Sequence, residues 1–124
     1  MHQPDPPVSL SVSRRDSGLL IVAIQGELDT LATRLIEPAF SVALSDRTAH
    51  ALVDLHQVPL ITSAALAMFV MRARALHLGG GNLRFAGATP PVQLVFDLGG
   101  FSQVLPVYAT LDEGIAAMER ELLP

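Results

Sequence analysis

The stretch Ala51-Leu52-Val53-Asp54-Leu55 opens the part of the chain that decides the fold, because this short apolar run is followed by a helical pattern. The helical pattern covers residues 63–78 and ends at Gly79-Gly80-Gly81, where a glycine can adopt the left-handed conformation that closes a helix. Residues 82–87 then return to a strand-like pattern. A strand, a helix and a strand in this order predict parallel strands joined by a crossover helix.

The flanking segments extend this pattern in both directions. Val8–Ser13 alternates apolar and polar residues, as a half-buried edge strand does, and 19–24 is a continuous apolar run typical of a strand covered on both faces. Val104–Tyr108 is a short strand that Pro106 limits to an edge. The order β-β-α-β-α-β-α-β-α predicts a single α/β domain over residues 8–122, with about five strands in a mixed, mostly parallel sheet and about four helices. Residues 1–7 contain three prolines and are expected to be a frayed terminus.

Capping residues mark where the helices begin. Asp29 or Thr30 can cap the first helix, and Pro90-Pro91 fit the first turn of the third. Thr110, with Glu113 three residues later, forms a capping box for the last helix.

The apolar faces of the first two helices follow from residue spacing. Pro38 lies inside the first helix and is expected to kink or divide it. Met68, Phe69 and Met71 cannot all face one core, so one of the two methionines is expected to be exposed for a partner. The predicted faces are Leu31, Leu35, Phe40, Val42 and Leu44 in the first helix, and Leu66, Phe69, Val70, Ala73 and Leu76 in the second.

The composition excludes several classes of function. Of the 124 residues, 50% are hydrophobic and 16% are charged, which excludes disorder for most of the chain. The net charge of −4 argues against binding to nucleic acid. The absence of cysteine and lysine excludes disulfides, thiolate chemistry and lysine Schiff bases. Neither a signal peptide nor a membrane-spanning stretch is expected, which predicts a cytoplasmic protein with no membrane partner.

Motifs of catalysis and metal binding do not emerge from the sequence. The chain contains no Gly-Lys-Ser/Thr phosphate loop, no G-x-G-x-x-G and no G-x-S-x-G, so we expect no enzyme activity, no cofactor and at most weak nucleotide binding. His50, Asp54 and His56 alternate along a strand as metal ligands would. The strand is expected to end near Leu55, however, and we therefore expect no metal site.

Two segments are expected to carry the function because of their place in the fold. In open α/β sheets, sites gather at the carboxyl ends of strands and the amino ends of helices, which here are residues 26–30 and 58–66. Glu27 and Asp29 lie in the first of these, a strand-to-helix loop. Turn formation and helix capping by Asp29 is the alternative role.

Several segments, in their order and spacing, resemble the STAS domain, the family of bacterial anti-sigma factor antagonists. Ile21–Asp29 resembles the family's apolar strand ending in G-x-L/I-D, and 51–58 resembles its L-V-L-D-L-x-x-V strand. Residues 83–87 resemble its L-x-L-x-G strand, and 98–108 its L-x-G-L-x-x-x-L-x-V-Y ending. The resemblance covers about residues 8–122.

The resemblance implies both the fold and a mechanism of transcription regulation. Such domains bind an anti-sigma factor that is also a serine kinase, and the binding frees the sigma factor. The kinase reverses the binding by phosphorylating a hydroxyl in a D-S-[S/T]-G-L motif at the start of the second helix, because the added charge disrupts the interface, and a phosphatase resets the switch. The implied partner surface in this chain is Glu27, Asp29, Thr30, Thr62, Ser63, Ala64, Ala65 and Leu66.

The phosphorylation motif departs from the family pattern. Its aspartate falls on Thr62, its first serine on Ser63, its phosphoacceptor on Ala64 and its glycine on Ala65. Ala64 has no hydroxyl and cannot be phosphorylated. Three interpretations follow: an antagonist that is always competent to bind, an antagonist phosphorylated on Ser63 or Thr62, or a module that no longer recognises a kinase. Helix capping is the competing role of both hydroxyls.

A further partner and an alternative function stay open at this point. The exposed apolar content is consistent with a homodimer. A non-switching STAS interaction or assembly module, with a small ligand or a nucleotide, is the alternative function.

Overall fold

The computed structural model describes residues 7–123 and has the predicted order of elements. The expectation for the amino terminus therefore falls, except for Pro7, outside the described residues. The elements are β1 (Val8–Arg14), β2 (Leu20–Gly26), α1 (Thr30–Ala43), β3 (His50–Gln57), α2 (Ser63–Leu78), β4 (Asn82–Ala86), α3 (Pro90–Leu98), a 3-10 turn η1 (Phe101–Gln103), β5 (Val107–Tyr108) and α4 (Leu111–Glu121).

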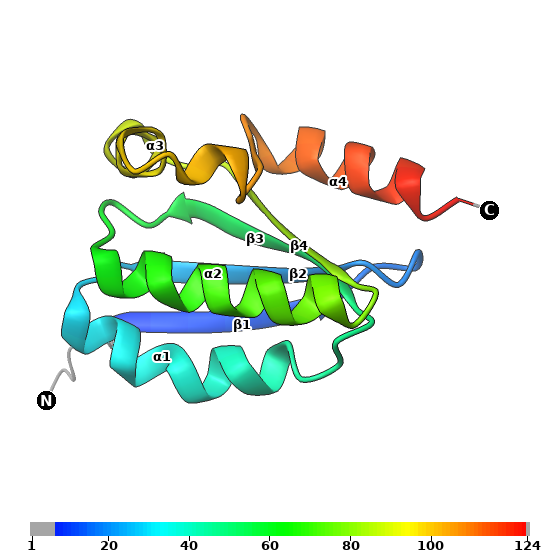
Figure 1. Ribbon diagram of the computed structural model, residues 1–124, viewed down its shortest axis with the longest axis horizontal. Helices are drawn as coiled ribbons and strands as arrows, with labels where there is room; N and C mark the ends of the chain where they lie inside the picture. Colours follow the sequence, from blue (N-terminus) through cyan, green and yellow to red (C-terminus); the bar gives the residue numbers. More distant parts are fainter. Residues whose placement is uncertain (1–6, 124) are drawn as a thin grey trace, which may run out of the picture.

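The five strands form one mixed sheet in the order β1-β2-β3-β4-β5. β1 pairs with β2 antiparallel, and all other neighbours are parallel. β1 and β5 are the edge strands, as the alternation in β1 and Pro106 before β5 predict. α1 and α2 lie side by side along the strands (Figure 1). Their amino ends meet at the edge where the parallel strands end, which is the edge that positions the candidate site.

The sheet is buried on both faces in its centre. Alternate residues of β2 point to opposite sides, so that Leu20, Val22 and Ile24 pack toward α1 and α2 while Ile21 packs toward α4. This explains why β2 reads as a continuous apolar run. Within residues 7–123, no helix combines the length and the apolar character that crossing a membrane requires.

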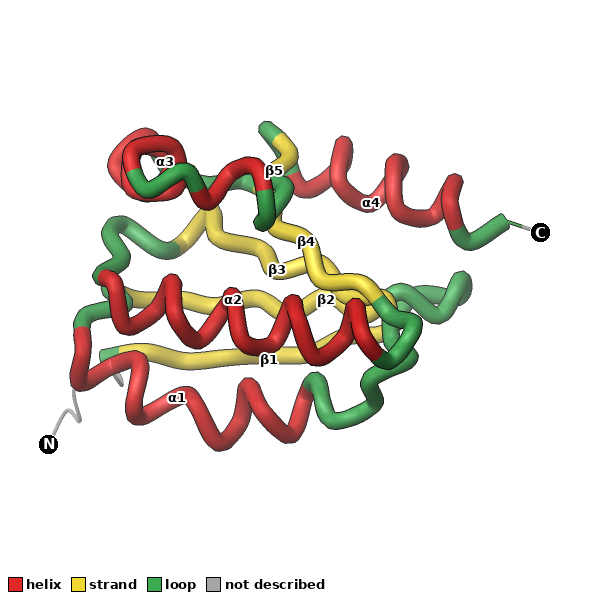
Figure 2. The backbone as a smooth tube through the Cα atoms, viewed as in Figure 1, coloured by secondary structure: helices red, strands yellow, loops and turns green. Residues whose placement is uncertain are grey.

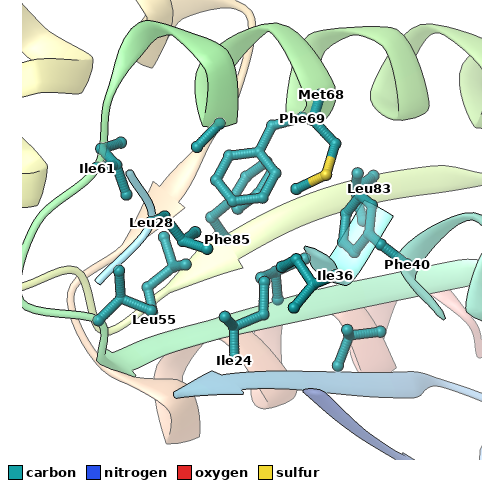
Figure 3. Close-up of a cluster of buried hydrophobic side chains, with 14 of the residues drawn as sticks. Ile24, Leu28, Ile36, Phe40, Leu55, Ile61, Met68, Phe69, Leu83 and Phe85 are labelled. Atoms are coloured by element: carbon teal, nitrogen blue, oxygen red, sulfur yellow. The ribbon is translucent and has the colours of Figure 1, made fainter. Parts of the chain in front are cut away.

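Phe69 lies at the centre of the larger core, between the sheet and the helices (Figure 3). Its ring centroid is 4.8 Å from that of Phe85, 5.8 Å from Phe40 and 6.5 Å from Phe96. These four rings come from α2, β4, α1 and α3, so one aromatic cluster joins three helices to the sheet.

The predicted apolar face of α1 is wrong for three of its residues. Leu31, Leu35 and Val42 are 65%, 55% and 74% exposed. The buried stripe runs instead through Ala32, Thr33, Ile36 and Phe40. Ala32, Ile36 and Phe40 recur every four residues and face the sheet, whereas the predicted stripe starts one residue earlier and is rotated by about 100°. Pro38 does not divide the helix, which is continuous from Thr30 to Ala43, and the proline lies on its exposed side.

The predictions for α2 are confirmed in outline. Leu66, Phe69 and Leu76 are buried, whereas Val70 and Ala73 are only partly buried. Met68 is 6% exposed and Met71 is 68% exposed, so one methionine of the pair does face outward. At the end of α2, Gly80 has a φ of +93°, and the Gly81 N–H donates to the Leu76 carbonyl at 2.8 Å. The glycine triplet thus closes the helix as predicted.

Candidate functional site

A parallel β-bridge between Leu28 and Ile61 brings the two predicted functional segments together. The Leu28 N–H donates to the Leu60 carbonyl at 2.9 Å, and the Thr62 N–H donates to the Leu28 carbonyl at 3.1 Å. The loop after β2 and the loop before α2 therefore form one surface, although they are more than thirty residues apart in sequence.

The side chains of Leu28 and Ile61 anchor this surface from below. Leu28 is fully buried and Ile61 is 6% exposed, and both point into the main core (Figure 3). Because successive residues of an extended segment point to opposite sides, Glu27 and Asp29 on either side of Leu28 are directed outward, and both are exposed. The burial of one leucine thus presents two carboxylates to solvent.

Asp29 is the N-cap of α1. Its Oδ1 accepts a hydrogen bond from the Ala32 N–H at 2.7 Å, and its carbonyl accepts from the Thr33 hydroxyl at 2.7 Å. The capping role that the sequence offered as the alternative for Asp29 is therefore present, while the residue as a whole stays exposed. Thr30 is the first residue of α1 and is exposed as well.

Thr62 occupies the N-cap position of α2 but does not cap it with its side chain. Its Oγ1 donates instead to the Leu28 carbonyl at 3.1 Å, across the bridge between the two loops. The competing role of a helix cap does not apply to Ser63, because Ser63 is already the first helical residue. Its side chain is exposed.

The remaining three residues of the predicted site differ in accessibility. Ala64, in the first turn of α2, is partly exposed. Ala65 is fully buried and Leu66 is 5% exposed, because both face the sheet. Their side chains support the surface from the core side and do not lie on it.

A match to a family model decides which family this arrangement belongs to. The model of the STAS domain matches residues 11–114. The chain belongs to the STAS family. Among curated proteins, this STAS domain is similar to the anti-sigma F factor antagonist of Paenibacillus polymyxa, with 26% identity over 92 residues, 73% of this chain and 79% of the relative.

Two solved structures share the fold of this STAS domain. An anti-sigma factor antagonist from Mycobacterium paratuberculosis superposes with a TM-score of 0.80 at 24% identity, covering 94% of this chain and 97% of that one. The anti-sigma factor antagonist SpoIIAA in its unphosphorylated form superposes with a TM-score of 0.72 at 19% identity, covering 94% of this chain and all of the other.

Backbone conformation and close packing explain why position 26, the first of the G-E-L-D segment, is a glycine in this STAS domain. Its φ is +116°, and a Cβ built there would lie 2.3 Å from the Pro7 carbonyl oxygen. Only glycine permits this approach of the chain that enters β1. A shallow cavity of about 260 Å³ lies beside it, lined by Pro7, Glu27, Asp29, Leu31 and Ala32.

The sequence predicts no metal site at His50, Asp54 and His56 because the strand is expected to end near Leu55, but the strand is longer in the structure. β3 continues to Gln57, two residues beyond Leu55. Asp54 is 4% exposed and bonds the exposed His56 through Nδ1 at 2.7 Å, whereas His50 lies at the other end of the strand. Within residues 7–123, no three metal-ligating side chains come together.

Sequence reasoning missed the contacts that hold the site loops. Besides the Thr62–Leu28 bond, the Thr89 hydroxyl donates to the Val58 carbonyl at 3.1 Å and holds the loop before α2 to the start of α3. Thr62 and Thr89 both occupy N-cap positions, where a threonine in the sequence predicts a helix cap. No local pattern distinguishes a capping hydroxyl from one that bonds a distant carbonyl.

Proposed function

We propose that this STAS domain, taken as residues 8–122, is an anti-sigma factor antagonist that acts by binding, without a reaction of its own. The observation that carries the proposal is the Leu28–Ile61 bridge, which joins residues 26–30 and 58–66 into one exposed surface. The relative from Paenibacillus polymyxa and both structural neighbours bear the name of anti-sigma factor antagonists. The proposed partner is an anti-sigma factor with a serine-kinase domain.

The proposed contact surface has an acidic part and a hydroxyl part. Glu27 and Asp29 supply two exposed carboxylates beside Thr30, and Ser63 lies at the exposed start of α2. Carboxylates in such a position favour arginine or lysine on the partner and mainly accelerate association. Added salt should therefore slow association more than it accelerates dissociation.

We propose further that the binding does not depend on phosphorylation at the usual position. Ala64 offers no acceptor oxygen. Thr62 uses its hydroxyl to bond the Leu28 carbonyl, so phosphorylation there would remove this side-chain bond between the two loops and leave only their two backbone hydrogen bonds. Ser63 is the more accessible substitute, because it is exposed at the first position of α2.

The experiment mixes the purified protein with each serine-kinase anti-sigma factor of its own genome, with and without ATP. Complex formation and intact mass are read from the same samples. We expect a complex that persists in ATP, with no phosphoryl group added. A phosphoryl group on the wild-type chain contradicts phosphorylation independence, and no complex with any kinase contradicts the antagonist function.

Variants at positions 63 and 64 test which hydroxyl could accept a phosphoryl group. Ala64→Ser restores the hydroxyl and is expected to gain one phosphoryl group and to lose the complex in ATP. Adding Ser63→Ala to the Ala64→Ser variant shows which hydroxyl accepts the phosphoryl group, because the added phosphate persists only if the acceptor is the serine at position 64. Thr62→Ser is the matched control, because it keeps the bond to Leu28.

The acidic part is tested without disturbing the helix. Asp29→Asn removes the charge but keeps a side chain that caps helices as well as aspartate does. Asp29→Asn and Glu27→Gln are each expected to slow association several-fold at low salt and to leave the thermal midpoint nearly unchanged. Unchanged association rates for both variants would remove the carboxylates from the proposed interface.

The alternative is a non-switching STAS module that assembles with other proteins or binds a small ligand or nucleotide. A chain that binds no kinase but copurifies in a stable assembly would favour it. The predicted homodimer stays a prediction, and Met71, 68% exposed on α2, is where we expect a second copy to pack. Sedimentation of the wild type and of Met71→Gln tests it.

A further inference from the structure

A cavity of about 620 Å³ lies away from the proposed partner surface. Its walls are the carboxyl-terminal half of α2, the beginning of β4 and the segment 104–106 that leads into β5. The proposed partner surface is at the amino end of α2, so the two sites are at opposite ends of the same helix. The inference below is therefore independent of the proposed function.

The cavity exists because β5 is short. β5 covers only the end of β4, where Phe85 pairs with Val107 and Ala86 with Tyr108 (Figure 2). The Phe85 N–H donates to the Pro106 carbonyl at 3.0 Å. The backbone of Leu83, two residues before Phe85, lies along the same edge of β4. Within residues 7–123, no backbone hydrogen bond joins Leu83 to segment 104–106. The first half of β4 thus keeps an open edge.

The floor and walls of the cavity are apolar. Leu83 and Leu105 belong to the core and are 2% and 1% exposed. Val70 and Ala73 of α2 are partly buried beside them, and Val104, which is 64% exposed, lies on the opposite wall. An apolar ligand would exclude water from the exposed parts of Val70, Ala73 and Val104, which stand above the buried Leu83 and Leu105.

The titratable groups around the cavity are all basic: His50, Arg74, His77 and Arg84. Arg84 is already engaged, because its guanidinium bonds the Tyr108 hydroxyl at 2.7 Å and Glu121 at 2.8 Å. Arg74 and His77 are one turn apart on α2 and exposed. In the described part of the chain, neither forms an ion pair. Arg74 thus offers a free positive charge, and His77 offers imidazole nitrogens, on a protein whose net charge is −4.

We propose that this cavity binds a small amphiphilic anion, a molecule with an apolar body and one carboxylate or sulfonate group. The apolar body lies over Leu83 and Leu105, and the anion meets Arg74 and His77. A volume of about 620 Å³ lies within the range of small-molecule sites. The open edge of β4 beside Leu83 is too short for an added peptide strand.

The test titrates the isotope-labelled protein with decanoate and follows backbone and methyl resonances. We expect saturable shifts at Val70, Ala73, Leu83 and Leu105. 1-Decanol carries the apolar chain without the charge, and acetate carries the charge without the chain. Decanoate is expected to bind about tenfold more tightly than decanol, and acetate is expected not to saturate.

Variants distinguish a charged site from a merely apolar crevice. The double variant Arg74→Gln, His77→Gln is expected to weaken decanoate about tenfold and to leave decanol unchanged. Arg34→Gln, an exposed arginine on α1, is the matched control and should change neither. Ala73→Phe fills the cavity and should abolish both. Equal affinity for decanoate and decanol, shifts elsewhere in the protein, or no saturable binding overturns the proposal.

Discussion

At the scale of single residues, Gly18 and Gly26 both have a positive φ, but only one of them also lies too close to another part of the chain to accept a side chain. Gly18, in the turn between β1 and β2, has a φ of +93°, and a Cβ added there would meet nothing within 4 Å. Gly26 has a φ of +116°, and its added Cβ would meet the Pro7 carbonyl at 2.3 Å. Only Gly26 is therefore required by close packing as well as by its backbone conformation.

Alanine substitution at the two glycines tests this distinction. Gly18→Ala is expected to cost about 1–2 kcal/mol of unfolding free energy, the strain of a left-handed alanine. Gly26→Ala is expected to cost more, about 3 kcal/mol or above, because β1 must also move away from the loop that carries Glu27 and Asp29. Urea denaturation of both variants measures the difference. Equal losses would show that the chain around Pro7 yields freely.

At the scale of elements, the turn of the first hairpin is tied to the last helix. The Arg15 Nε donates to Glu119 Oε2 at 3.0 Å, and the Ser17 hydroxyl donates to the same oxygen at 2.5 Å. The hydrogen bond from Arg15, and then that from Ser17, hold the pKa of the Glu119 carboxyl below its ordinary value. α4 is thereby linked to the β1–β2 turn through one carboxylate.

This tie predicts a dependence of stability on acid. Because the pKa of Glu119 is lower in the folded than in the unfolded chain, its contribution to stability is present above the ordinary pKa of a glutamate and is lost as the pH falls through the lower pKa of the folded chain. Between pH 6 and pH 3, the thermal midpoint of Glu119→Gln should fall less than that of the wild type. Glu37→Gln, which changes an exposed carboxylate of α1, is the control and should follow the wild type.

At the scale of the whole molecule, the aromatic cluster around Phe69 connects three helices to the sheet, and we expect these elements to unfold together. Phe69 contacts rings from α1, α3 and β4, so its removal loosens three connections at once. Large-to-small substitutions in such a core lose both the buried surface and the packing around the cavity left behind.

We expect Phe69→Ala to lower the unfolding free energy by about 3–5 kcal/mol. Phe101→Ala, at a partly buried ring outside the cluster, is the control and should cost less. Equilibrium denaturation followed by circular dichroism and by hydrogen exchange at α1, α2 and α3 reports whether the three helices open together. A loss below about 1 kcal/mol would exclude Phe69 as the hub.

The sequence by itself determined the features that depend on near neighbours. The order of strands and helices, a cap of α1 at Asp29 or Thr30, the glycine end of α2 and the Thr110 cap all follow from patterns spanning a few residues, and the structure selects Asp29 for α1. The tertiary structure alone decided which residues join the correctly predicted Phe40 in the buried stripe of α1, because only contact with the sheet selects Ala32 and Ile36 over Leu31 and Leu35, one residue earlier. It also decided that Thr62 bonds Leu28 instead of capping α2, since a hydroxyl takes whichever acceptor the folded chain brings within reach, and this one lies thirty-four residues away.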